Sequence, residues 1–432
     1  MIPAVERKAI SDLLQREVVP AIGCTEPMAV ALCTARAREL LETVPERIDV
    51  MLSANILKNA MGVGIPGTGM IGLPVAVALG AHVGRSEYGL EVLRDVTPEA
   101  VAEARRYLAE ERIAIALKEG AVPTLYVEVE CRSGNRRAAA IIADTHTRFV
   151  YLSLDDKVLL DLRDGAAAES EEREVPLTLR RVYDYAVTSP IEELAFIDEA
   201  QRLNISAAEL AFKGEYGHSL GRTLCGEKEL HVMGNTLFSR ILAYTSAACD
   251  ARMAGAMVPV MSNSGSGNQG IAATVPVAVY AEQTGATKEQ TRRALVLSHL
   301  TAVYIKQSLG RLSALCGCVV AATGSSCGIT YLMGGGYREI TYAVQNMIAN
   351  LTGMICDGAK PSCALKVSSG VSTAVMSALL AIEGKCVTSV EGIIDEDVDR
   401  SIRNLTAIGR DGMAATDRLV LDIMTHKGTG GC

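Results

Sequence analysis

Three long stretches of the chain carry no charged side chain, and they limit its fold more than any other feature. They cover residues 59–84, 253–281 and 312–337, and each is longer than the roughly 20 residues that span a bilayer. The first contains seven glycines and two prolines, and the other two contain runs rich in glycine and serine. Irregular backbone of this kind is costly in lipid, where its polar groups find no partners. We therefore expect buried or cavity-lining segments of a soluble protein rather than a membrane transporter.

The composition predicts a globular protein without a nucleic-acid or membrane partner. Hydrophobic residues make up 49% of the 432 positions, which allows a large core and excludes disorder. With 42 basic and 50 acidic side chains the net charge is −8, whereas nucleic-acid binding needs a basic face. The first eight residues include Glu6, Arg7 and Lys8 and lack the apolar core of a signal peptide. We expect a cytoplasmic location, where thiols stay reduced.

The sequence pattern predicts an α+β fold with two domains. Residues 1–165 are expected to form an N-terminal α/β domain with antiparallel strands, and residues 161–174 a charged, alanine-rich linker. Residues 175–432 are expected to form a mainly α-helical domain. In the first domain the predicted helices are 5–19, 27–41 and 97–111, and the predicted strands are 47–52, 124–131, 137–143 and 147–154. In the second domain the predicted helices are 190–213, 232–254, 271–282, 288–308, 340–349, 372–381 and 395–405.

The cysteines are unusually numerous and unevenly spread. Of the twelve in the chain, five lie within residues 316–363: Cys316, Cys318, Cys327, Cys356 and Cys363. No C-x-x-C pair occurs, which counts against a zinc ribbon, and no C-x₂-C-x₂-C run occurs, which counts against a ferredoxin. Burial as small hydrophobic residues is one interpretation. The other is that cysteines from separate loops of the helical domain hold one metal cluster.

Two further segments have the composition of an amino-acid site. Cys24 stands just before a predicted helix, whose positive end lowers the pKa of a nearby thiol, so a thiolate general base is one interpretation and a core cysteine the other. Residues 264–270 precede the helix expected to begin at residue 271, and their amides offer a site for a substrate carboxylate. Lys306 is a second candidate for the carboxylate. The histidines show no ligand spacing and are expected to be structural: His82, His146, His218, His231, His299 and His426.

Four segments together resemble the L-cysteine desulfidase family, which is related to the iron–sulfur-dependent L-serine dehydratases. They are Ala-Ile-Gly-Cys-Thr-Glu-Pro at 21–27, Ser-Ala-Asn-Ile-Leu-Lys-Asn-Ala at 53–60, Ser-Gly-Ser-Gly-Asn-Gln-Gly at 264–270 and Cys-Asp-Gly-Ala-Lys at 356–360. The likeness runs over nearly the whole chain. It implies a [4Fe–4S] cluster held by three cysteines with one iron open. Carried over by spacing, the ligands are Cys316, Cys356 and Cys363, with Cys318 as an alternative to Cys316.

The resemblance also implies an activity. The expected enzyme is a carbon–sulfur lyase that converts L-cysteine to hydrogen sulfide, ammonia and pyruvate through 2-aminoacrylate, with Cys24 as the base. We expect a homodimer. In the related serine dehydratases a C-terminal cysteine can reach the open iron, so Cys432 is expected to occupy the site. The expected substrate-binding residues are Thr25, Asn55, Asn59, Ser264, Gly265, Asn268 and Lys306.

Two alternative activities remain open at this stage. The same cluster would serve an L-serine ammonia-lyase, although Cys24 stands where serine dehydratases resemble a Ser-Ser-His-Thr segment, which favours a thiol substrate. A pyridoxal-phosphate β-lyase would need Lys58 or Lys366 as its Schiff-base lysine.

Overall fold

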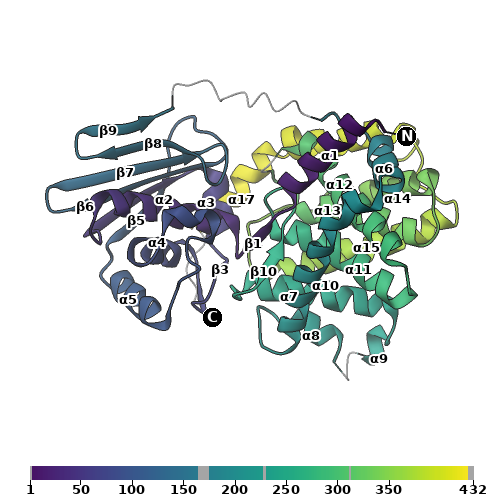
Figure 1. Ribbon diagram of the computed structural model, residues 1–432, viewed down its shortest axis with the longest axis horizontal. Coiled ribbons are helices and arrows are strands. Elements are labelled where there is room, and N and C mark those ends of the chain that lie inside the picture. The colour runs from purple at the N-terminus through teal and green to yellow at the C-terminus, as the bar shows by residue number, and fades with distance from the viewer. Residues whose placement is uncertain (1, 164–174, 227–229, 311–312, 427–432) are drawn as a thin grey trace.

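The computed structural model describes residues 2–163, 175–226, 230–310 and 313–426. A sheet with its helices forms one end of the molecule and a helical body forms the other (Figure 1), which confirms the predicted α+β class. The elements at the sheet end are β1 (Pro20–Ile22), α2 (Thr25–Leu41), β2 (Arg47–Leu52), α3 (Ala54–Ala60), β3 (Gly64–Ile65), β4 (Met70–Ile71), α4 (Leu73–His82), α5 (Pro98–Ala109), β5 (Ile113–Leu117), β6 (Tyr126–Ser133), β7 (Arg136–Ala143), β8 (Phe149–Leu154) and β9 (Lys157–Asp161).

The helical body begins with the first helix of the chain and resumes after β9. Its elements are α1 (Ala4–Glu17), α6 (Leu179–Thr188), α7 (Asp198–Phe212), α8 (Leu220–Leu224), α9 (Leu230–Met233), α10 (Leu237–Met253), β10 (Pro259–Met261), α11 (Gly267–Thr284), α12 (Lys288–Leu309), α13 (Gly317–Leu332), α14 (Tyr337–Leu351), α15 (Cys363–Ile382) and α16 (Val398–Ala407). The last helix, α17 (Ala414–His426), packs against α3 at the sheet end.

The main sheet has the strand order β5-β2-β6-β7-β8-β9. Only the β2–β5 pair is parallel, so the expected antiparallel arrangement holds for the rest. Alternate residues of β2 and β6 are buried, as the two-residue period of a strand requires when one face is covered. That face packs against α2, on which α4 lies in turn. The predicted hairpin is β6–β7, and Gly134 takes a φ of 54° in its turn.

The helical body is organised around α13, which packs against α11, α12, α14 and α15. Its residues from Cys318 to Thr330 are buried without exception. Small residues make this possible: a Cβ on Gly324 would lie 2.2 Å from the carbonyl oxygen of Ser298 on α12. The uncharged stretches thus form α4, α11 and α13, and the expectation of buried backbone is confirmed.

One helix within the described residues, α15, is long and apolar enough to cross a membrane by length and composition alone. Half of its most apolar window is buried inside the protein. The core helix of a soluble protein passes the same test, so this single helix is weak evidence for a membrane span.

Two large clusters of buried side chains form the main cores, and they do not follow chain order. Ile10 and Leu13 of α1 belong to the core of the helical body, as does Cys24. Leu421 of α17 belongs to the core of the sheet end. The first helix of the chain therefore packs in the helical body, and the last helix packs against the sheet end. The expected division into residues 1–165 and 175–432 stays a prediction.

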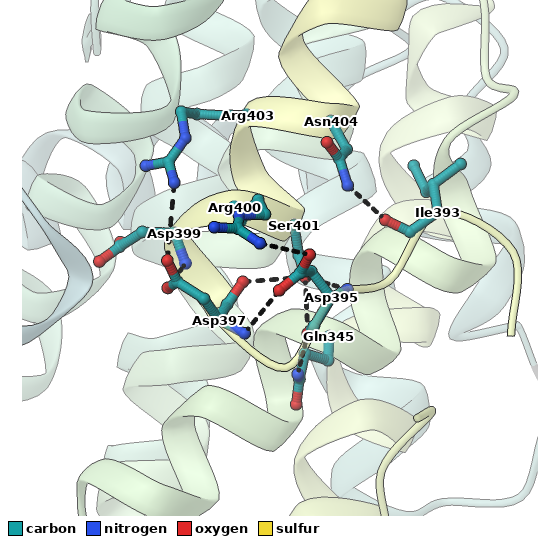
Figure 2. Close-up of polar contacts among 9 residues, drawn as sticks. All are labelled: Gln345, Ile393, Asp395, Asp397, Asp399, Arg400, Ser401, Arg403 and Asn404. Carbon is teal, nitrogen blue, oxygen red and sulfur yellow. Dashed lines mark hydrogen bonds and ion pairs between the residues drawn. The ribbon is translucent and has the colours of Figure 1, made fainter. Parts of the chain in front are cut away.

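An acidic segment before α16 shows how that helix is fixed (Figure 2). The carboxylate of Asp397 caps α16 by accepting the N–H of Asp399 at 2.9 Å. Asp395 accepts the N–H of Asp397 at 3.0 Å and a guanidinium N–H of Arg400 at 3.4 Å. Asp399 in turn accepts the hydroxyl of Tyr304 on α12 at 2.7 Å. The acidic run is therefore a structural cap that braces α16 against the core.

Candidate active site

A cavity of about 120 Å³ lies where the N-terminal end of α2 meets the N-terminal ends of α11, α13 and α15. Its volume is small beside the roughly 300–1,000 Å³ of pockets for drug-sized ligands, so it suits a small molecule. Ten of the predicted site residues line it: Cys24, Thr25, Asn59, Ser264, Gly265, Asn268, Lys306, Cys316, Cys356 and Cys363.

Two predicted site residues do not join this group. Asn55 lies in the first turn of α3, outside the cavity lining, and its Oδ1 is buried without a hydrogen-bond partner. Cys432 lies outside the described residues. The cavity is also lined by residues that were not among the predicted site residues: Glu26, His146, Arg252 and Gln269.

The three predicted cluster ligands line one wall of the cavity. Cys316 is the N-cap of α13, and Cys363 is the first residue of α15. A short bridge places Cys356 beside Cys316: the N–H of Cys316 donates to the carbonyl of Met354 at 2.9 Å, and the N–H of Cys356 donates to that of Ala314 at 2.6 Å. Two segments far apart in the sequence, one with Cys316 and the other with Cys356 and Cys363, thus bring three thiols to one place.

The electrostatics of this wall suit thiolate ligands, which form when a bound metal replaces the thiol protons. Burial, reinforced by the neighbouring Cys356 and Cys363, raises the pKa of Cys316 to about 12. Burial likewise raises the pKa of Cys363. The thiols of Cys316 and Cys363 are therefore neutral until a metal displaces their protons. The positive ends of α13 and α15 both face the wall and would stabilise the resulting negative charge.

The donor set fits an iron–sulfur cluster better than a single metal ion. Within the described residues no three His, Cys, Asp or Glu side chains form a group that would hold one ion. Cys316, Cys356 and Cys363 instead surround a shared space, as thiolates bound to separate irons do. Cys318 also borders the cavity, but its Sγ donates to the backbone carbonyl of Lys366 at 3.1 Å and packs against Gly370. This contact favours Cys316 as the ligand.

Cys24 occupies the N-cap of α2, as expected, but its thiol does not have the expected low pKa. Burial raises that pKa first, and the carboxylate of Glu26 raises it further, while Arg252 acts in the opposite direction. The Cys24 thiol donates to Glu26 Oε2 at 2.9 Å. The expectation of a lowered pKa is therefore wrong, because desolvation and a neighbouring anion outweigh the helix end.

Glu26 links Cys24 to the segment before α11. The Thr25 hydroxyl lies 3.0 Å from both Glu26 Oε2 and the carbonyl oxygen of Gly265. Ser264 and Gly265 have φ values of 49° and 79°, which turn the backbone toward the cavity. The strand pair β1–β10 holds the same two regions together.

The loop expected over residues 264–270 is shorter than predicted. Helix α11 begins at Gly267, because the side chain of Ser266 accepts the N–H of Gln269 and caps the helix. A Cβ on Gly270 would lie 1.8 Å from the carbonyl oxygen of Met261, so this glycine is needed for the close approach of β10. Residues 264–266 of the glycine-rich motif thus form a turn, and residues 267–270 form the first turn of α11. The positive end of this helix lies at the cavity.

The fold and this site define a lyase of the serine dehydratase type. The family model described as serine dehydratase alpha chain matches residues 87–422. The chain belongs to this family, and the predicted relation to the iron–sulfur-dependent serine dehydratases is confirmed.

Several curated relatives match over almost their full length. A UPF0597 protein of Bacteroides thetaiotaomicron is 68% identical over 99% of each chain. A UPF0597 protein of Porphyromonas gingivalis is 56% identical over 98% of this chain and 99% of the relative. One from Photobacterium profundum is 45% identical over 96% and 98%.

Proposed function

We propose that this protein is a carbon–sulfur lyase that converts L-cysteine to hydrogen sulfide, ammonia and pyruvate through 2-aminoacrylate. Its membership of the serine dehydratase alpha chain family supports a lyase. The observation that carries the proposal is a single cavity in which the Cys24–Glu26 pair and the three thiols of Cys316, Cys356 and Cys363 meet. The alternative is an L-serine ammonia-lyase with the same residues.

Cys316, Cys356 and Cys363 would hold a [4Fe–4S] cluster. When bound, such a cluster with one open iron supplies a Lewis acid for the departing β-substituent of the substrate. The thiols of these residues give up their protons on metal binding, and the ends of α13 and α15 offset the charge. Sulfide is the leaving group in the proposed reaction, and hydroxide in the alternative.

Cys24 is the base that removes the Cα proton of the substrate. Because its thiol donates to Glu26, the thiol becomes a base only when Glu26 takes its proton. The resulting thiolate then accepts the proton from Cα, and the β-substituent leaves. The product 2-aminoacrylate tautomerises to its imine, and water hydrolyses the imine to pyruvate and ammonia.

The lysines do not support pyridoxal-phosphate chemistry. A Schiff-base lysine needs a lowered pKa. Burial works in that direction at Lys366, but the hydrogen bond and charge of Asp357 outweigh it, and the pKa of Lys366 is raised. Lys58 is buried in an ion pair with Asp417. Both amines are therefore already committed to carboxylates.

Anaerobic purification followed by two measurements tests the proposal. We expect about four iron and four acid-labile sulfide per chain, and sulfide with pyruvate from L-cysteine at a higher kcat/KM than pyruvate from L-serine. Single changes of Cys316, Cys356 or Cys363 to Ala are expected to abolish both cluster and activity, whereas Cys318→Ala keeps them. Full activity in iron-free protein would falsify the proposal that a [4Fe–4S] cluster takes part in the reaction. A preference for L-serine would replace the proposed activity with the alternative.

A further inference from the structure

One buried cation in the cavity has no acidic partner. Arg252 stands in the last turn of α10, is 3% exposed and lines the cavity. Its Nη1 donates to Oδ1 of Asn268 at 3.0 Å. Its Nε is buried without any hydrogen-bond partner, and no ion pair joins Arg252 to a carboxylate in the described parts of the chain.

A buried guanidinium without a counter-charge is unfavourable, because it has lost its hydration and gained no anion. The carbonyl end of α10 offsets part of the charge. The acid of the cavity, Glu26, already accepts hydrogen bonds from Cys24 and Thr25. The positive charge of Arg252 is thus held in the site without a dedicated partner.

The position of this side chain is specified by the glycine-rich motif. A Cβ on Gly267 would lie 2.2 Å from Nε of Arg252 and 2.7 Å from its Cζ. Gly267 is the first residue of α11 and has no positive φ, so its backbone does not require glycine. What requires glycine is the space taken by the guanidinium. The missing side chain at Gly267 leaves room for the Arg252 guanidinium beside the cavity, and the hydrogen bond to Asn268 orients that guanidinium.

We propose that Arg252 binds the α-carboxylate of the amino-acid substrate. The inference rests on the proposed function and adds to it the charged group that selects α-amino acids. A guanidinium offers two parallel N–H donors that match a carboxylate. The thiols of Cys316, Cys356 and Cys363 lie on the wall formed by α13 and α15. A substrate held by Arg252 would thus extend its β-substituent toward them, and the amides at the start of α11 would assist.

Inhibition by two small thiols, only one of which has a carboxylate, distinguishes the carboxylate contact from the other contacts of the substrate. 3-Mercaptopropionate carries a thiol and a carboxylate, whereas cysteamine carries a thiol and an amine. In cluster-loaded Arg252→Gln we expect the inhibition constant of 3-mercaptopropionate and the KM for L-cysteine to rise about 10- to 100-fold, the effect of a lost hydrogen bond to a charged group. The inhibition constant of cysteamine is expected to stay within about twofold of wild type. Arg240→Gln, at an exposed position of the same helix, is the matched control.

The ligand-induced rise in melting temperature is a second readout, because it needs no turnover. If Arg252→Gln binds 3-mercaptopropionate as wild type does, the inference is overturned while the proposed function stands. If wild type acts on neither L-cysteine nor L-serine, the proposed function fails, and a stabilisation by 3-mercaptopropionate that Arg252→Gln lacks still supports the carboxylate site. If Arg252→Gln does not fold, Gly267→Ala keeps the arginine but takes its space. It should show the same selective loss, and normal binding there would also contradict the inference.

Discussion

The thiol of Cys24 and the carboxylate of Glu26 form the smallest unit of the site. They are joined by a 2.9 Å hydrogen bond, and both side chains are buried. Desolvation keeps the thiol protonated, and the negative charge two residues away reinforces the effect. The reactivity of Cys24 is therefore governed by Glu26 as much as by the nearby N-terminal end of α2.

Replacing Glu26 by Gln tests this dependence. Removing the negative charge is expected to lower the pKa of Cys24, so at a fixed pH below that pKa iodoacetamide alkylates the residue faster. The same change is expected to reduce kcat at least about tenfold, because an amide cannot receive the thiol proton. The pH profile of Cys24 alkylation, followed by mass spectrometry of its peptide, checks the first effect. Glu26→Asp is the control that keeps the carboxylate, and an unchanged alkylation profile in Glu26→Gln would contradict the pairing.

The sequence predicted the residues that a motif marks and missed those that only packing reveals. Cys24 and Ser264 lie in recognisable segments and reach the cavity. Glu26 lies in one of those segments too, but an acid in a first helical turn has an ordinary explanation, which concealed its contact with the thiol. Arg252 is a single arginine in a helical pattern, and its burial is a consequence of tertiary structure. His146 was expected to be structural and lines the cavity.

At the scale of elements, His299 on α12 connects two other segments. Asn263, just before the glycine-rich motif, donates to Nδ1 and to the backbone carbonyl of His299, each at 3.1 Å. Thr274 of α11 lies 2.9 Å from Nε2 of the same ring. Ser264 donates in turn to Asn263 at 3.0 Å, so the histidine supports the backbone that lines the cavity. Burial lowers the pKa of His299 to about 3, which keeps the ring neutral.

This histidine predicts a pH dependence of stability. An unfolded histidine titrates near 6.5, so between about pH 6.5 and 3 the unfolded chain binds a proton that the folded chain refuses. Stability contributed by the neutral ring is therefore lost as the pH falls below about 6.5. Compared with His299→Gln, wild type should lose about 1.4 kcal/mol more between pH 7.5 and 5.5. Urea denaturation at both pH values measures this difference, and equal losses in the two proteins would refute it.

Elements defined by local signals were predictable, and those defined by distant partners were not. The hairpin β6–β7 and helix α5, with Thr97 as its cap, lie close to their predicted positions. The single helix expected over residues 190–213 is a 3₁₀ segment at Ile191–Ile197 followed by α7. The parallel strand β5 and the pair β1–β10 join residues far apart in the sequence, and no local pattern announces such pairings.

At the scale of the whole molecule, each terminal helix packs against the part formed by the other half of the chain. Helix α1 packs against α12 in the helical body, while α17 packs against α3 at the sheet end. In Figure 1 α17 lies between the two ends of the molecule. The cavity takes Asn59 from the sheet end and the three cluster thiols from the helical body, so it lies where the two parts of the chain meet.

An ion pair between Lys58 and Asp417 holds α17, near the end of the chain, against α3 at the sheet end. Lys58 is 1% exposed and sits on α3, and Asp417 reaches it from α17 with a fifth of its side chain exposed. Asp417→Asn leaves a buried ammonium without its partner, which is expected to lower the free energy of unfolding by about 3 kcal/mol. The local consequence is release of α17, because Leu421 is its one buried residue.

Urea denaturation and limited proteolysis measure the two effects together. Cleavage within α17 should accelerate in Asp417→Asn before the rest of the protein is attacked, since local opening precedes global unfolding. The double change Lys58→Met with Asp417→Asn removes the buried charge as well, and it should recover most of the lost stability because methionine fills a similar volume. Asp422→Asn, at an exposed position of the same helix, serves as the control. Equal stability of Asp417→Asn and this control would show that the ion pair does not hold α17 in place.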